Sequence, residues 1–136
     1  MRTGYYAVSG TIPGGIGISR TIPKFFRGPR YLPLAPPFEM LKCRKDLYTI
    51  QYQEQILDQL NPQQVYDDLV RLAKDKEPIL LCWERANTWC HRRLVAEWLE
   101  DALHIEITEM GFARDQCVPY KDLPVVKKYR GPTFSG

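Results

Sequence analysis

The chain has no apolar run close to the roughly 18–20 residues that a membrane-spanning helix needs, so the sequence excludes a membrane segment. Its first residues, Met1–Ser9, carry one cation, and their apolar stretch is too short for the core of a secretory signal. We therefore expect a cytoplasmic protein without a membrane partner.

Cysteines are few and widely spaced. The four cysteines, at positions 43, 82, 90 and 117, do not resemble the dense disulfide framework of a small secreted domain. The chain also lacks a Cys-x-x-Cys motif. This distribution suits a reducing compartment, in which any disulfide would be transient.

The net charge of the chain is low, at +3, and does not by itself indicate nucleic-acid binding. Its distribution is more informative: one segment holds no acid, and its cations alternate with aromatic residues, namely Arg20, Lys24, Phe25, Phe26, Arg27, Arg30 and Tyr31. Such a segment is typical of a surface that neutralises phosphates and stacks bases. A loop fixed to the core by its aromatics, with solvated cations, has the same composition.

A glycine-containing segment, Pro13–Arg20, precedes these cations and could wrap an anion with backbone N–H groups. It lacks the Gly-Lys-Ser/Thr ending of a phosphate loop and the Gly-x-Gly-x-x-Gly of dinucleotide-binding folds. Ordinary turn chemistry also explains it.

The chain has the length of one domain, residues 1–136, and we expect a core over about residues 5–111 with an irregular tail at 112–136. Strand patterns lie at 5–9, 47–52, 79–83 and 104–109, and a long loop runs from Thr11 to Pro37. One helix begins after Asn61 and ends near Ala73, and another begins after Asn87 or Thr88 and ends at Leu103. This alternation predicts a small three-layer, Rossmann-like α/β domain with a mostly parallel sheet.

The joint between the strand at 79–83 and the helix that follows concentrates reactive side chains. It contains Cys82, Glu84, Cys90, His91 and Arg92. In open α/β sheets, ligands bind at the carboxyl ends of strands and the amino ends of helices. We therefore place the candidate site at this joint.

At this joint the chain resembles the domain of unknown function 488 family, through Leu80-Leu81-Cys82-Trp83-Glu84 and Cys90-His91-Arg92. The resemblance extends to Ile18-Ser19-Arg20, Pro23-Lys24-Phe25-Phe26 and Leu34-Ala35-Pro36, and covers about residues 6–111. It implies a compact α/β domain of prokaryotic or phage type with a site near the Cys-His-Arg residues.

The cysteines and the histidine admit several functions. Cys90 in the first helical turn would have a lowered thiol pKa. Adjacent helical side chains diverge by about 100°, so a Cys82–His91 pair is favoured over a Cys90–His91 pair. Glu84 would then be an orienting or acid–base group. The interpretation of Cys82 and His91 as core residues is favoured over cysteine catalysis. A Cys82–Cys90 redox pair remains open, and no metal site is predicted, because the ligand spacing matches no usual zinc motif.

Our leading hypothesis from the sequence is a protein that binds a phosphorylated ligand, a nucleotide or nucleic acid, between the basic loop and the Cys-His-Arg helix start. The ligand-binding candidates are Ser9, Arg20, Lys24 and Arg92, with Arg20 and Arg92 clamping the anion. If the protein is an enzyme, its catalytic candidates are Cys82, Glu84, Cys90 and His91, and no particular cofactor is indicated. The rival hypothesis is a non-catalytic phage or prokaryotic accessory protein whose Cys-His-Arg cluster is structural.

Overall fold

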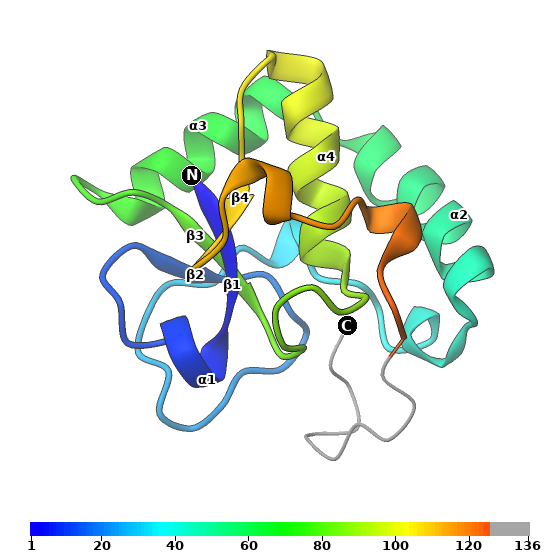
Figure 1. Ribbon diagram of the computed structural model, residues 1–136, viewed down its shortest axis with the longest axis horizontal. Helices are drawn as coiled ribbons and strands as arrows, with labels where there is room; N and C mark the ends of the chain where they lie inside the picture. Colours follow the sequence, from blue (N-terminus) through cyan, green and yellow to red (C-terminus); the bar gives the residue numbers. More distant parts are fainter. Residues whose placement is uncertain (126–136) are drawn as a thin grey trace.

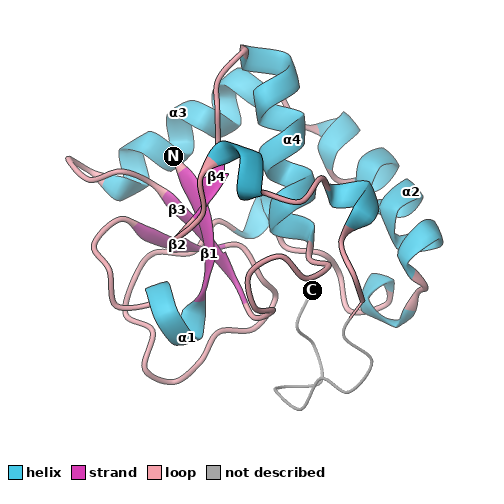
Figure 2. Ribbon diagram, viewed as in Figure 1, coloured by secondary structure: helices cyan, strands magenta, loops and turns pink. Residues whose placement is uncertain are grey.

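The computed structural model describes residues 1–125 and shows an α/β domain built on one parallel sheet (Figures 1 and 2). Its strands and helices follow in the order β1 (Arg2–Tyr5), α1 (Tyr6–Ser9), β2 (Gly15–Gly17), α2 (Lys45–Gln55), α3 (Pro62–Ala73), β3 (Ile79–Cys82), α4 (His91–Leu103) and β4 (Thr108–Glu109). Single 3-10 turns connect them: η1 (Leu32–Leu34), η2 (Met40–Lys42), η3 (Leu57–Gln59), η4 (Arg114–Gln116) and η5 (Tyr120–Asp122).

The four strands lie in the order β2-β3-β1-β4, and every pairing is parallel. In the register of β1 and β3, Tyr5 lies opposite Cys82, so both strands end at the same edge. This edge continues into α1 on one side and into the joint before α4 on the other. The prediction of a small Rossmann-like α/β domain with a parallel sheet is confirmed.

Alternating side chains of β3 divide the core into two clusters. Leu80 packs with Ile16 and with buried residues of α2, α3 and α4 on one face of the sheet. Ile79 and Leu81 pack on the other face with Tyr6 and Phe26. The long helices therefore cover one face, whereas the one-turn helix α1 and the loop around Phe26 cover the other.

Helix α3 follows its sequence signals closely, whereas α4 begins at His91 with Cys90 as its N-cap, and not after Asn87 or Thr88. Asn61 caps α3, since its Oδ1 accepts a hydrogen bond from the Gln64 amide at 3.1 Å, and Pro62 occupies the first turn. Helix α4 ends at His104, whose φ of 55° stops the right-handed path. The helices contact each other above the sheet (Figure 1).

The strand predicted at 47–52 is wrong, because these residues belong to helix α2. Tyr48 and Tyr52, one helical turn apart, are buried with stacked rings whose centroids are 5.8 Å apart. Leu47 and Ile50 are about half exposed. The apolar alternation that predicted a strand therefore includes aliphatic side chains that the fold leaves at the surface.

The outer strands also differ from the sequence prediction. The first strand lies earlier, at Arg2–Tyr5, and residues 6–9 form α1 instead. The last strand shrinks to Thr108–Glu109. The predicted loop from Thr11 to Pro37 contains β2, whose short Gly-Ile-Gly sequence pairs along β3.

Two side chains within residues 112–125 join the core, although the sequence predicted that the core ends near residue 111. Tyr120 and Leu123 are buried, and the Trp89 indole donates a hydrogen bond to the Tyr120 hydroxyl at 2.7 Å. Residues 126–136 of the predicted tail lie outside the described residues. Among the helices of residues 1–125, none has the length and apolar character needed to cross a membrane.

Candidate functional site

The Cys-His-Arg residues meet where β3 ends and α4 begins. Cys82 is the last residue of β3, Cys90 is the N-cap of α4, and His91 and Arg92 form its first turn. Each of these four side chains is at most 1% exposed. The joint that the sequence singled out is therefore assembled, but it is closed to solvent.

Cys82 and Cys90 are joined by a disulfide, which links the end of β3 to the start of α4. This is the pairing that the sequence analysis left open as a redox pair. The sulfur atoms and a ring nitrogen of His91 all lie within 4.8 Å of one another. Three donor groups that are separated along the chain therefore form one compact cluster in space.

His91 contacts Cys90, the pairing that the sequence analysis ranked lower. Its Nδ1 lies 3.8 Å from the Cys90 sulfur. Cys90 has extended backbone angles, φ −162° and ψ 148°, because it is the N-cap and not a helical residue. The divergence of adjacent helical side chains, on which that ranking depended, does not apply here.

The interior holds His91 in its neutral form. Burial lowers the pKa of His91 to about 3; the Arg92 charge lowers it further, and a hydrogen bond to the Ile18 carbonyl opposes the shift. Nε2 lies 2.7 Å from that carbonyl oxygen, so Nε2 carries the proton and donates. Nδ1, facing Cys90, is then the free acceptor of the ring.

Arg92 is fully buried and bonded to protein acceptors. Its Nη2 lies 2.7 Å from Glu109 Oε2, and its Nη1 donates to the Glu84 carbonyl at 2.7 Å and to the Cys82 sulfur at 3.1 Å. A further bond reaches the Arg85 carbonyl. The guanidinium therefore organises the interior and does not face a ligand.

Glu109, at the end of β4, is the partner that the sequence analysis missed. Burial alone would raise the pKa of Glu109, but the Arg92 charge and hydrogen bonds from Arg92 and Thr3 hold it below its ordinary value. Arg93, also buried, donates to the Thr3 hydroxyl at 2.7 Å. The sequence signal was present, since two arginines on a helix with an apolar stripe require acceptors.

Glu84 lies two residues beyond β3 and is nearly buried. Its charge is among the causes that raise the pKa of Tyr48 well above its ordinary value, after burial itself and the neighbouring tyrosines. The carboxylate is thus close enough to the tyrosines of α2 to affect them. The orienting or acid–base role of Glu84 stays a prediction from the sequence.

The other ligand-binding candidates do not converge on this joint. Arg20 donates to the carbonyl oxygens of Ala35 and Pro36, at 2.8 and 3.1 Å, and so fixes the loop after η1. Ser9, the last residue of α1, is buried, whereas Lys24 is exposed. Arg20 and Arg92 therefore do not form the predicted clamp, because both are directed at backbone carbonyls or buried acids.

The structure instead brings together two other sequence features. Gly10–Gly15 and Phe25–Pro29 line one hollow of about 360 Å³, which we name the loop hollow. Phe25 is 49% exposed at this hollow, and Arg27 and Lys24 are exposed. The glycine-containing segment and the basic aromatic segment thus form one surface, which their separation along the chain did not indicate.

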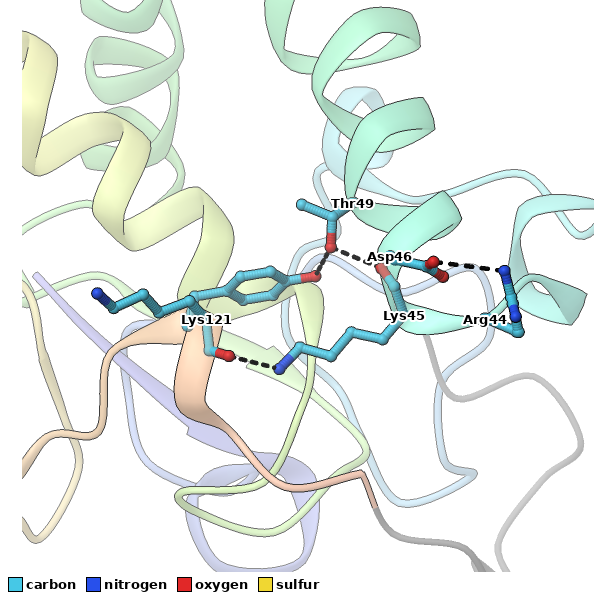
Figure 3. A pocket seen from close by; sticks show the side chains of 6 residues that line it. Arg44, Lys45, Asp46, Thr49 and Lys121 are labelled. Carbon is cyan, nitrogen blue, oxygen red and sulfur yellow. Dashed lines mark hydrogen bonds and ion pairs between the residues drawn. The ribbon is translucent and has the colours of Figure 1, made fainter.

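A second hollow, of about 560 Å³, lies between the start of α2 and η5 (Figure 3). Two of its cations, Lys45 and Arg44, are engaged by the protein: Lys45 donates to the carbonyl oxygens of Lys121 and Leu123, both at 3.0 Å, and Arg44 pairs with Asp46 at 3.4 Å. The Tyr120 hydroxyl is within hydrogen-bond distance of Thr49. This hollow is therefore less suited to an anion than its composition suggests.

Residues 33–99 match the model of the family described as Domain of unknown function DUF488. The match includes α2, α3, β3 and the first part of α4, with Cys82, Cys90, His91 and Arg92. It is shorter than the resemblance over residues 6–111, and the segments around Arg20 and Phe25 lie outside it. No curated protein and no solved structure matches the chain.

Proposed function

We propose that this chain, whose residues 33–99 match the DUF488 family model, binds a phosphorylated ligand, a nucleotide free or within nucleic acid, in the loop hollow. The observation that carries the proposal is the joint lining of that hollow by the glycine segment and the basic aromatic segment. The ligand class is the one that the composition of the segment indicates. The proposed binding site is therefore the loop hollow, and not the Cys-His-Arg joint that the sequence favoured.

Phe25 and Arg27 supply the two kinds of contact that such a ligand needs. A half-exposed phenyl ring offers a face on which a base stacks. The Arg27 guanidinium has five N–H donors, and among the described residues it uses one of them, to the Lys24 carbonyl at 2.6 Å. Its remaining donors and the Lys24 ammonium are available to phosphate oxygens.

Glycine lets the opposite wall of the loop hollow turn tightly against the backbone next to β3. Gly14 has a φ of 98°, a conformation that side-chain-bearing residues rarely adopt. A Cβ at Gly14 would lie 2.1 Å from the Glu77 carbonyl oxygen, so the position requires glycine. The turn holds its backbone close to β3, where Ile79 donates to the Gly14 carbonyl at 2.9 Å.

For the Cys-His-Arg joint we propose the structural role of the rival hypothesis. The observation in its favour is the burial of Cys82, Cys90, His91 and Arg92, together with the Arg92–Glu109 pair that links α4 to β4. A catalytic group must reach its substrate, and these groups face protein atoms. The joint then fixes β3, α4 and β4 to one another at this edge of the sheet.

Equilibrium binding tests the loop hollow. Labelled single-stranded oligonucleotides are titrated by fluorescence anisotropy, and adenosine triphosphate by calorimetry, so that the two sources of nucleotide are compared. Phe25→Ala should weaken binding about tenfold, as stacking is worth about 1–3 kcal/mol per base. Arg27→Ala should weaken binding and lower the slope of log affinity against log salt by about one for the oligonucleotide.

Arg44→Ala is the matched control, because Arg44 is an exposed cation at the second hollow. We expect it to bind both probes like the unaltered protein. Equal losses in Arg27→Ala and Arg44→Ala would mean that binding follows general charge and not the loop hollow. Absence of binding at low salt would contradict the proposal altogether.

A further inference from the structure

We propose that Cys82, Cys90 and His91 form a buried zinc site when the two cysteines are reduced. Their ligand atoms lie within 4.8 Å of one another at the joint of β3 and α4. Two thiolates and one imidazole are donors that zinc prefers, and three protein ligands leave a fourth tetrahedral position for a water molecule. This inference does not depend on the loop hollow.

His91 is already oriented as a ligand. Its Nε2 donates to the Ile18 carbonyl at 2.7 Å, and its Nδ1 faces the Cys90 sulfur at 3.8 Å. Histidines that bind metals usually donate their second ring N–H to a carbonyl or carboxylate in this way. With bonds of about 2.3 Å to sulfur and 2.0 Å to nitrogen, a tetrahedral ion places these two atoms about 3.5 Å apart.

The backbone at the two cysteines is set wider than is usual for a disulfide. Their Cα atoms are 7.5 Å apart, whereas about 4.4–6.8 Å is usual for a disulfide. A tetrahedral zinc ion would hold the sulfurs about 3.8 Å apart. Side-chain rotation at Cys82 and Cys90 can reach that separation without moving β3 away from α4.

The disulfide and the metal are alternative states of one cluster. A dithiol reductant transfers two electrons and two protons to the Cys82–Cys90 disulfide and is itself oxidised to a disulfide. The two thiols formed then release their protons as Zn²⁺ binds the thiolates. Each state joins the end of β3 to the start of α4.

Charge balance favours the loaded site in this interior. One Zn²⁺ ion neutralises two thiolates, and the adjacent Arg92 is neutralised by Glu109, whose Oε2 lies 2.7 Å from Nη2. Arg92 Nη1 also lies 3.1 Å from the Cys82 sulfur and can donate a hydrogen bond to it as a thiolate. The ion, its two thiolates and the Arg92–Glu109 pair then sum to zero charge, as suits a buried site.

Cobalt titration under anaerobic conditions tests the site. The full chain, purified without a histidine tag, is reduced and freed of metal, and Co²⁺ is added as a coloured substitute for zinc. We expect one equivalent to give thiolate-to-cobalt charge-transfer bands and the visible bands of tetrahedral Co²⁺, and zinc to remove both. X-ray absorption of the zinc-loaded protein should show two sulfur ligands and one imidazole.

Variants assign the ligands. Cys82→Ser, Cys90→Ser and His91→Gln should each lower Co²⁺ affinity by more than the roughly 10–100-fold that loss of an outer contact causes. Cys43→Ser and Cys117→Ser are matched controls, since both cysteines lie outside the cluster, and they should bind Co²⁺ normally. If the ligand variants do not fold, X-ray absorption of the unaltered protein decides the ligand set.

Three results would overturn the proposal. The first is a reduced chain without tetrahedral Co²⁺ bands. The second is a disulfide that cannot be reduced in the folded protein, so that no metal enters. The third is loss of the bands in Cys43→Ser or Cys117→Ser with the cluster intact.

Discussion

Arg92 and Glu109 form an ion pair in the interior, with Nη2 2.7 Å from Oε2 and side-chain exposures of 0% and 1%. Arg92 lies in the first turn of α4 and Glu109 at the end of β4, so the pair ties the helix to the edge strand of the sheet. A charge buried this deeply is tolerated only when it is paired and hydrogen-bonded. The integrity of the sheet edge therefore depends on both partners.

Glu109→Gln should destabilise the protein by about 3–5 kcal/mol, because it leaves the buried Arg92 charge without its counter-ion. Urea denaturation of the purified variant measures this loss. Arg114→Ala, which removes the partly exposed pair with Glu100, is the control and should change stability by less than about 1 kcal/mol. A Glu109→Gln loss as small as the control would show that the interior pair contributes no more than a surface pair.

Acid should weaken the metal-free, chelator-treated protein through His91. Burial lowers the pKa of His91 to about 3 from an ordinary 6.5. Below pH 6.5, His91 therefore binds a proton in the unfolded chain but stays neutral in the folded chain. The free energy of unfolding then falls with falling pH, by about 1.5 kcal/mol between pH 6.5 and pH 5. The carboxylate Glu109, whose pKa is lowered, adds to the loss only at lower pH.

Urea denaturation at pH 6.5, 5.75 and 5 measures the His91 contribution. His91→Gln should flatten this dependence. His104→Asn, which changes an exposed histidine to a residue that tolerates the same left-handed backbone, should retain it. A pH dependence that His91→Gln leaves unchanged would contradict the account.

Gly14→Ala should be far more destabilising than Gly111→Ala. Both glycines have positive φ, 98° and 86°, so both substitutions incur a backbone penalty of about 1–2 kcal/mol. A Cβ at Gly14 would also meet the Glu77 carbonyl oxygen, whereas a Cβ at Gly111 meets nothing within 4 Å. Thermal unfolding of the two variants compares them, and equal shifts in melting temperature would argue against the tight turn beside the loop hollow.

Much of the fold follows from local signals. Helix α3 has an asparagine cap and a first-turn proline, and β3 is a short apolar run between charges, so their identity is visible in the sequence. Helix α2 is not visible in this way. Its residues carry a strand-like alternation, and only the packing of Tyr48 and Tyr52 against the rest of the core selects the helix.

The sequence identified the joint of β3 and α4 as a candidate site, but it did not indicate which side chains contact one another there. The spacing of Cys82, Cys90 and His91 predicted no metal site, because spacing along a chain does not measure distance across a strand–helix joint. Arg92 was assigned to a ligand because its partner, Glu109, follows 17 residues later on another element. Similarly, only tertiary packing places Gly10–Gly15 beside Phe25–Pro29.

The most direct test of the account is amide NMR of the ¹⁵N-labelled chain during titration with a short single-stranded oligonucleotide and, separately, with adenosine triphosphate. We predict that binding shifts the amides of the loop hollow, above all Thr11, Gly14, Phe25, Arg27 and Gly28, and leaves those of Cys82–Arg92 nearly unchanged. Shifts centred on Cys82–Arg92 with the loop hollow unaffected would contradict the central claim.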